Sequence, residues 1–161
     1  MDFFLKNLCD LRIEEFTDNK KVLIGLDIGD KTIGLAVSDK RNRIASSVAT
    51  IIRKNDTTDY ETLLRHIKHY DVGLAVFGWP IQMNGKAGPQ CEKVSAFVGG
   101  FSGHTNGVLF APWDERFSTS VVEHVMIEAD MSRGKRSRLL DKTAAIYILQ
   151  GAIDFLNRPR S

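Results

Sequence analysis

The sequence predicts an α/β domain in which a mixed five-stranded sheet carries helices on both faces. The first indication is a pair of strand-like runs, 22–28 and 32–38, separated by a tight turn. The second is two short apolar runs, 72–78 and 107–112, with the length of strands covered on both faces. The third is that apolar residues recur at helical spacing between and after these runs. A helix between two strands serves as the crossover that joins parallel neighbours, so the later strands are expected to be parallel.

Local signals place the first elements. The turn at 29–31 joins the first two strands, and a third strand begins near Ile44, so the chain opens as an antiparallel meander. Thr57 or Thr58 can cap the next helix. The apolar positions of that helix recur at helical spacing and are Tyr60, Leu63, Leu64 and Ile67.

The remaining elements alternate between strands and helices. Pro89 suits the first turn of a helix after the strand at 72–78. We expect the glycines at 99, 100 and 103 to loosen the chain at the end of that helix. The fifth strand is expected at 107–112, followed by helices at 119–129 and at about 137–156. The expected order is therefore β-β-β-α-β-α-β-α-α.

The composition indicates a single folded domain. The chain has 161 residues, of which 43% are hydrophobic and 26% are charged, and its net charge is +2 at pH 7. Cys9 and Cys91 lack the spacing of a zinc site or a disulfide framework, which favours a cytoplasmic setting. Residues 1–20 lack the pattern of a signal peptide or a membrane span. We expect an N-terminal extension there, helical or frayed, before a domain at 21–158.

An acidic residue inside the first strand is the first functional signal. Asp27 shares one face of the strand with Gly25 and Gly29, while the bulky side chains occupy the other face. An ionised carboxylate in an apolar strand needs a hydrogen-bond partner or a cation. Glycines along one strand face indicate that a ligand or another backbone comes close. A crossing helix is the alternative that needs no ligand.

Acidic residues in two further segments support a metal site. Asp114 and Glu115 follow the fifth strand, where ligands gather in open α/β sheets, although both also suit the first turn of a helix. Asp141 lies on the small and apolar side of the last helix, which directs it toward the sheet. Converging carboxylates favour Mg²⁺ or Mn²⁺ over zinc. Two such ions would support an in-line displacement at phosphorus, which is nuclease chemistry.

Basic and loop residues indicate a nucleic acid partner and no membrane. The segment RGKRSR, 133–138, holds four cationic side chains, either as a phosphate-binding surface or as a solvated loop. The loop GWPIQMNGKAGP, 78–89, can hold phosphate through backbone N–H groups. Its Trp79 can stack on a base or instead cover the core. The candidate nucleic-acid-binding residues are Lys31, Trp79, Asn84, Lys86, Arg116, Arg133, Lys135 and Arg136.

Three sequence blocks resemble the YqgF family, also called RuvX, of ribonuclease H-like proteins. They are GLDIGDKTIGLAVSD, FGWPIQMNGKAGPQCEKVSAFV and DERFSTSVVEHVMIEADMSRGKRSRLLDKTAAIYILQGAIDF, and they span most of 22–155. The resemblance implies an RNase H-like sheet and an acidic triad, Asp27, Glu115 and Asp141, that binds two Mg²⁺ or Mn²⁺ ions. It also implies a cytoplasmic nuclease that trims the 5′ end of precursor 16S ribosomal RNA. The oligomeric state, monomer or homodimer, stays open. Holliday-junction resolution is the alternative activity in this family.

The sequence departs from the family pattern at three positions. Asp30 stands in a turn that usually reads Gly-Thr-Lys, Trp79 stands where Leu is common, and Ser118 stands where Thr is common. The first two bear on how the substrate fits. Two other interpretations stay open, namely a catalytically silent nucleic-acid-binding module and an actin-like or sugar-kinase-like ATPase. The ATPase is the weaker of the two, because such enzymes close two lobes over the nucleotide and 161 residues supply one.

Overall fold

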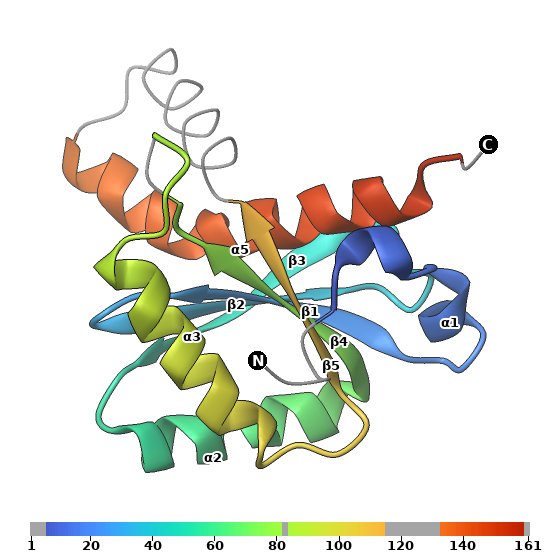
Figure 1. The fold of residues 1–161 in the computed structure, drawn as a ribbon, viewed down its shortest axis with the longest axis horizontal. Helices are drawn as coiled ribbons and strands as arrows, with labels where there is room; N and C mark the ends of the chain where they lie inside the picture. Colours follow the sequence, from blue (N-terminus) through green and yellow to red (C-terminus); the bar gives the residue numbers. More distant parts are fainter. Residues whose placement is uncertain (1–5, 82–83, 115–132, 160–161) are drawn as a thin grey trace.

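A mixed five-stranded sheet forms the centre of the computed structural model, with strand order β3-β2-β1-β4-β5 (Figure 1). The structure describes residues 6–81, 84–114 and 133–159, and for 133–143 it describes the backbone alone. The strands are β1 (Val22–Ile28), β2 (Thr32–Ser38), β3 (Ala45–Ile52), β4 (Val72–Trp79) and β5 (Leu109–Asp114). β2 is antiparallel to both β1 and β3, whereas β4 is parallel to both β1 and β5. The predicted mixed sheet is confirmed.

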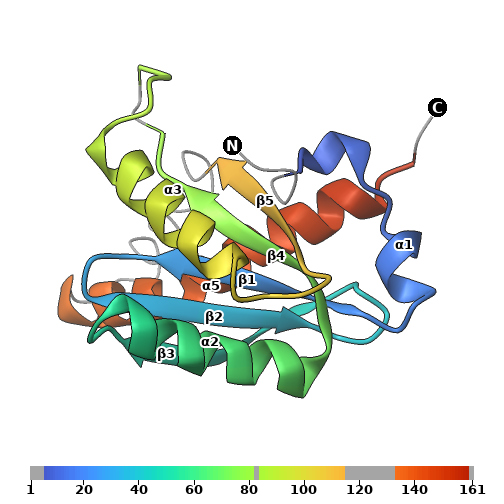
Figure 2. The ribbon, with the colours of Figure 1, turned by 60° about the horizontal axis from the view of Figure 1, so that its bottom comes forward.

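Helices cover both faces of the sheet, as Figures 1 and 2 show from two directions. One face packs against α2 (Asp56–Tyr70) and α3 (Pro89–Ser102), and the other against α5 (Arg133–Asn157). Because strand side chains alternate, β1 contributes Ile24 and Leu26 to the α2/α3 side and Leu23 to the α5 side. Each of the three is at most 1% exposed. The sheet therefore separates two apolar cores.

The described part of the N-terminal segment packs into the core on the α5 side. It contains a short 3-10 helix, η1 (Leu8–Asp10), and α1 (Glu14–Thr17). Leu8, Leu11, Ile13 and Phe16 are each at most 6% exposed and belong to the same apolar cluster as α5. The Lys6 N–H donates to the Phe110 carbonyl at 2.7 Å, which places this segment along the outer edge of β5.

Two boundaries differ from the sequence prediction for physical reasons. Asn55 rather than Thr57 or Thr58 caps α2, because its side-chain oxygen accepts from the Thr58 N–H at 2.9 Å. The helix α3 continues past Gly99 and Gly100 to Ser102. A Cβ at Gly100 would collide with the Tyr60 hydroxyl, so this glycine lets α2 and α3 approach instead of ending the helix.

The last two strand and helix boundaries also shift. The strand expected at 107–112 lies at Leu109–Asp114, so Asp114 is its final residue and does not follow it. The helix α5 includes the basic segment 133–138, which excludes the alternative that this segment is a loop. The helix expected at 119–129 lies outside the described residues. Across the ranges that the structure describes, no helix is both long and apolar enough to cross a membrane.

Candidate active site at the carboxyl edge of the sheet

The carboxyl ends of three parallel strands meet at one edge of the sheet. Asp27 is the penultimate residue of β1, Trp79 is the last residue of β4 and Asp114 is the last residue of β5. Trp79 and Asp114 are paired in register. This edge is where ligands bind in open α/β sheets, so the expected location of the site agrees with the strand topology.

Asp27 lies where the α5 face of β1 reaches the solvent. Leu23 and Gly25 on the same face are buried, whereas Asp27 is half-buried. Its register partner on β2 is Gly34, which has no side chain to cover the carboxylate from that side. The Asp27 carboxylate can therefore contact a solvent-borne ligand at the carboxyl edge.

The helix α5 covers the glycine patch beside Asp27. A Cβ at Gly25 would lie 2.7 Å from the Leu149 Cβ and 2.8 Å from the Ala145 carbonyl oxygen. Of the two explanations for the glycines, a ligand and a crossing helix, the crossing helix holds at Gly25. Asp27 is two residues farther along the strand, beyond this contact.

The direction of α5 is fixed by contacts at its C-terminal half. The Gln150 side-chain oxygen accepts from the Ala45 N–H at 2.8 Å, and the Asn157 amide donates to the Asn42 carbonyl at 2.9 Å. Both contacts are at the end of the sheet where β1 begins. Since Ala145 lies over Gly25, the preceding turns of α5 extend toward the carboxyl end of β1. Asp141 precedes Ala145 by one turn, about 6 Å along the helix axis.

The structure describes the three acids of the expected triad to different extents. The Asp27 side chain is described, Asp141 is placed by its helix backbone, and Glu115 lies outside the described residues. Among the side chains that are described, no three His, Cys, Asp or Glu residues form a group that could hold a metal ion. The carboxylate of Asp27 is a hard oxygen donor of the kind that Mg²⁺ and Mn²⁺ prefer, so the donor type fits such an ion.

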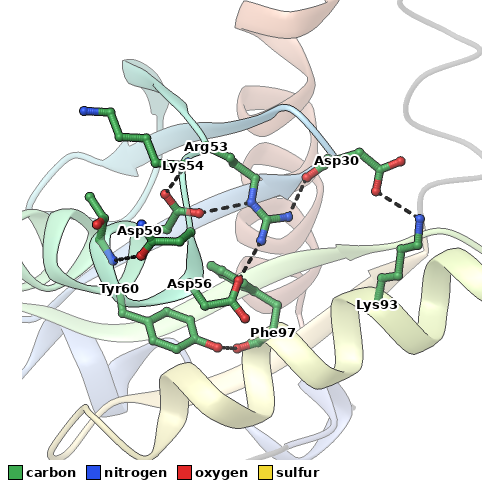
Figure 3. A network of polar contacts seen from close by, with 11 residues as sticks. Asp30, Arg53, Lys54, Asp56, Asp59, Tyr60, Lys93 and Phe97 are labelled. Atoms are coloured by element: carbon green, nitrogen blue, oxygen red, sulfur yellow. Dashed lines mark hydrogen bonds and ion pairs between the residues drawn. The ribbon is translucent and has the colours of Figure 1, made fainter.

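A partly buried ion pair fixes the turn that follows Asp27 (Figure 3). The Arg53 Nη1 donates to the Gly29 carbonyl at 2.8 Å, and the Arg53 Nε pairs with the Asp59 carboxylate at 3.2 Å. Asp59 is only 1% exposed and also accepts from the Lys54 N–H at 3.2 Å. The Arg53 guanidinium lies 4.6 Å from the centre of the Phe97 ring. These contacts join the turn at 29–31 to both α2 and α3.

Arg53 and Asp59 are site residues that no pattern in the sequence indicates. The two residues are separated by six positions across a helix start, a spacing that no regular element brings together. An Asp in the first turn of a helix is already favoured by the helix dipole, so nothing in the sequence distinguishes Asp59 from Asp56. Asp30 in the same turn forms an exposed ion pair with Lys93 of α3 at 3.3 Å.

The loop residues take different positions around the edge. Trp79 is half-buried, packs against the α2/α3 core and meets Phe77 edge-on at 6.2 Å, as the core-covering alternative expects. The Asn84 side chain accepts from the Lys86 N–H at 2.9 Å, and both residues are exposed. Lys31 is exposed in the turn after Asp27. Arg116 lies outside the described residues, and Arg133, Lys135 and Arg136 are placed by backbone alone on α5.

Comparisons with known proteins agree with this architecture. A family model described as "RuvX: Holliday junction resolvase" matches residues 21–155. A relative from Beijerinckia indica subsp. indica is 48% identical over 134 residues, covering 83% of this chain and 81% of the relative. A relative from Clostridium botulinum (strain Hall) is 44% identical over 136 residues, covering 84% of this chain and 98% of the relative. Both are named "Putative pre-16S rRNA nuclease".

A solved structure with low sequence identity has a similar fold. The structure titled "T. thermophilus RuvC in complex with Holliday junction substrate" superposes with a TM-score of 0.54 at 11% identity. The match covers 85% of this chain and 96% of that one. At this identity the likeness concerns the fold, and it confirms the RNase H-like sheet that the sequence resemblance implies. The family match over most of the chain, with relatives at 44% and 48% identity, shows that the chain belongs to the RuvX family.

Proposed function

We propose that this protein is a divalent-metal-dependent endonuclease that hydrolyses phosphodiester bonds. The observation that supports the proposal most directly is the position of Asp27, a half-buried carboxylate at the carboxyl edge, toward which the N-terminal half of α5 extends. The names of the two relatives and the family description favour a nucleic acid substrate. We infer that the substrate is the 5′ end of pre-16S rRNA, processed in the cytoplasm by a unit at 21–158 with residues 1–20 as an extension.

The proposed roles of the acids follow from their chemistry. Asp27 anchors the ion site, and Glu115 and Asp141 complete its carboxylate shell. When bound, Mg²⁺ or Mn²⁺, in one or two ions, would supply the positive charge that stabilises phosphoryl transfer. A water oxygen forms a bond to phosphorus as the water loses a proton to solvent, and the phosphodiester bond to the leaving oxygen breaks as that oxygen takes up a proton from solvent. The Arg53 contact with Gly29 holds the end of β1, and thereby Asp27, in a fixed orientation.

Basic and loop residues around the same edge are proposed to hold the nucleic acid. The exposed Lys31 and Lys86 are suited to phosphate contacts, and Asn84 orders the backbone beside Lys86. Because Trp79 is packed on the core, it can offer a base only the part of its ring that remains exposed. Arg116, Arg133, Lys135 and Arg136 complete the proposed set.

Cleavage assays with a matched pair of variants test the assignment. The substrates are a structured pre-16S rRNA fragment and a four-way DNA junction, each with Mg²⁺, with Mn²⁺ or with EDTA. We expect Asp27→Asn to lower the cleavage rate at least about 100-fold, and EDTA to abolish cleavage. Asp18→Asn, the same charge change at an exposed residue of the N-terminal segment, should cleave like the unmodified protein. Cleavage that is undiminished in Asp27→Asn refutes the proposed site.

The family description favours Holliday-junction resolution as the second candidate. Symmetric cleavage of the junction, with the RNA left intact, would select that activity over rRNA processing. A module that only binds nucleic acid would show strongly salt-dependent affinity and no metal-dependent product.

A further inference from the structure

Two adjoining hollows lie beside the C-terminal half of α5, outside the proposed active site. The first has a volume of about 500 Å³ and lies between residues 6–9 of the N-terminal segment, the end of β5 and Phe155 of α5. Trp113 and Phe155 form its aromatic wall, with ring centres 6.5 Å apart and an edge-on arrangement. Trp113 packs on α5 at Gly151, where a Cβ would lie 2.5 Å from the indole. Lys6 also lines this hollow.

The second hollow has a volume of about 300 Å³ and is rich in arginine. Arg12, Arg43 and Arg158 line it from three separate segments, and among the described residues that line it Glu14 is the one acidic side chain. All three arginines are exposed, and none of them forms an ion pair with a carboxylate in the described parts of the chain. The hollow therefore carries a positive charge that the described carboxylates leave mostly uncompensated.

One residue pair joins the two hollows. The Arg158 guanidinium lies 3.8 Å from the centre of the Phe155 ring. Phe155 lines the first hollow and Arg158 lines the second, so an aromatic surface continues directly into a cationic one. Trp113 immediately precedes Asp114, the last residue of β5, so this surface begins at the carboxyl edge that also carries Asp27.

We propose that this surface binds a single-stranded segment of the nucleic acid substrate. A base enters the hollow at Trp113 and Phe155, and the phosphates that follow it contact Arg12, Arg43 and Arg158. Aromatic stacking combined with a cationic track is how proteins bind single strands, and a paired base inside a duplex cannot reach such a hollow. The inference rests on the proposed function only in assuming a nucleic acid substrate, and it assigns the site a preference for an unpaired flank.

Tryptophan fluorescence tests the aromatic hollow. The chain has two tryptophans, so Trp79→Phe leaves Trp113 as the sole indole. In a protein that also carries Asp27→Asn, a single-stranded oligoribonucleotide should quench Trp113 saturably as it is titrated. A fully paired duplex of the same sequence should quench it much less. No quenching, or equal quenching by the duplex, overturns the proposal.

Charge reversal tests the arginine hollow. In the Asp27→Asn background, Arg12→Glu with Arg43→Glu should weaken single-strand binding by about 10-fold or more. It should also reduce the slope of log affinity against log salt by about 1 to 2. Arg65→Glu with Lys68→Glu, an equal charge change at exposed positions of α2, should have little effect. Equal weakening in the two double variants, or none in the first, overturns the proposal.

A small substrate separates this inference from the proposed function. With wild-type catalytic acids, Arg12→Glu/Arg43→Glu should slow the cleavage of long RNA by a larger factor than the hydrolysis of bis(p-nitrophenyl) phosphate, and an equal factor for both substrates would overturn the proposal. If Asp27→Asn leaves hydrolysis intact, the catalytic assignment fails, and the binding measurements still decide the surface. Melting temperatures of both double variants are measured alongside. A lower melting temperature with unchanged binding would assign the arginines to stability alone and refute the surface.

Discussion

The backbone of α5 lies so close to β1 that Gly25 and Leu149 leave no room for a methyl group. A Cβ at Gly25 would be 2.7 Å from the Leu149 Cβ, a separation that real Cβ atoms essentially never show. We expect Gly25→Ala to push α5 away from the sheet and to destabilise the fold by about 1–3 kcal/mol. Cleavage should fall as well if Asp141 of α5 has the role proposed for it.

Gly99→Ala is the matched control for that substitution. A Cβ at Gly99 meets nothing within 4 Å, and the residue lies inside α3. We expect it to be neutral or to stabilise by up to about 1 kcal/mol, because alanine favours helix. Urea unfolding of both variants measures the difference, and similar losses in the two would contradict the close packing of α5.

The second prediction concerns the ion pair beneath the turn. Arg53→Ala leaves the Asp59 carboxylate, 1% exposed, without its guanidinium partner. We expect a loss of about 2–4 kcal/mol, because a buried charge is then uncompensated. Adding Asp59→Asn to Arg53→Ala should restore part of that loss. Lys93→Ala removes an exposed pair and should cost less than about 1 kcal/mol. Equal losses for Arg53→Ala and Lys93→Ala would show that the network adds nothing.

The third prediction separates two properties of Asn42, which is fully buried. Its φ is +54°, and its side chain accepts from the Ser38 hydroxyl at 2.5 Å and donates to the Lys21 carbonyl at 3.0 Å. Asn42→Gly loses the hydrogen bonds but tolerates the backbone conformation, whereas Asn42→Ala loses both. Both variants should be destabilised, and the alanine variant by about 1 kcal/mol more. Equal unfolding free energies would refute the contribution of the backbone.

The fourth prediction is a pH dependence from His66 of α2. Partial burial, reinforced by the positive charges of His69 and Arg65, lowers the pKa of His66 below its usual 6.5. Between the folded pKa and 6.5 the unfolded chain binds more protons, so the unfolding free energy should fall as the pH falls through this window. Below the folded pKa this contribution is constant. His66→Gln should flatten this part of the profile measured by urea unfolding from pH 5 to 8, and an unchanged slope would contradict the assignment.

The strands were predictable because their signal is local. Alternation of side chains in 22–28 placed Asp27 opposite the bulky face, and the structure shows the same arrangement. The meaning of Gly25 was not predictable, because a close helix and a close ligand both require a missing side chain. Gly100 misled for a related reason, since the Tyr60 hydroxyl that occupies its space comes from another helix. The role of such glycines is decided by contacts between elements that are distant in sequence, and these contacts leave no periodic pattern in the sequence.

The packing of the N-terminal segment indicates that the residues covered by the family match depend on the residues before them. The match starts at residue 21, whereas Leu8, Leu11, Ile13 and Phe16 are buried ahead of it. A shortened chain starting at Lys21 would expose the apolar surface that these residues cover. It would also leave the Phe110 carbonyl of the edge strand β5 without its hydrogen bond from Lys6. Exposed edge strands can pair with strands of other molecules. We therefore expect the shortened chain to self-associate through the outer edge of β5 more readily than the full chain does.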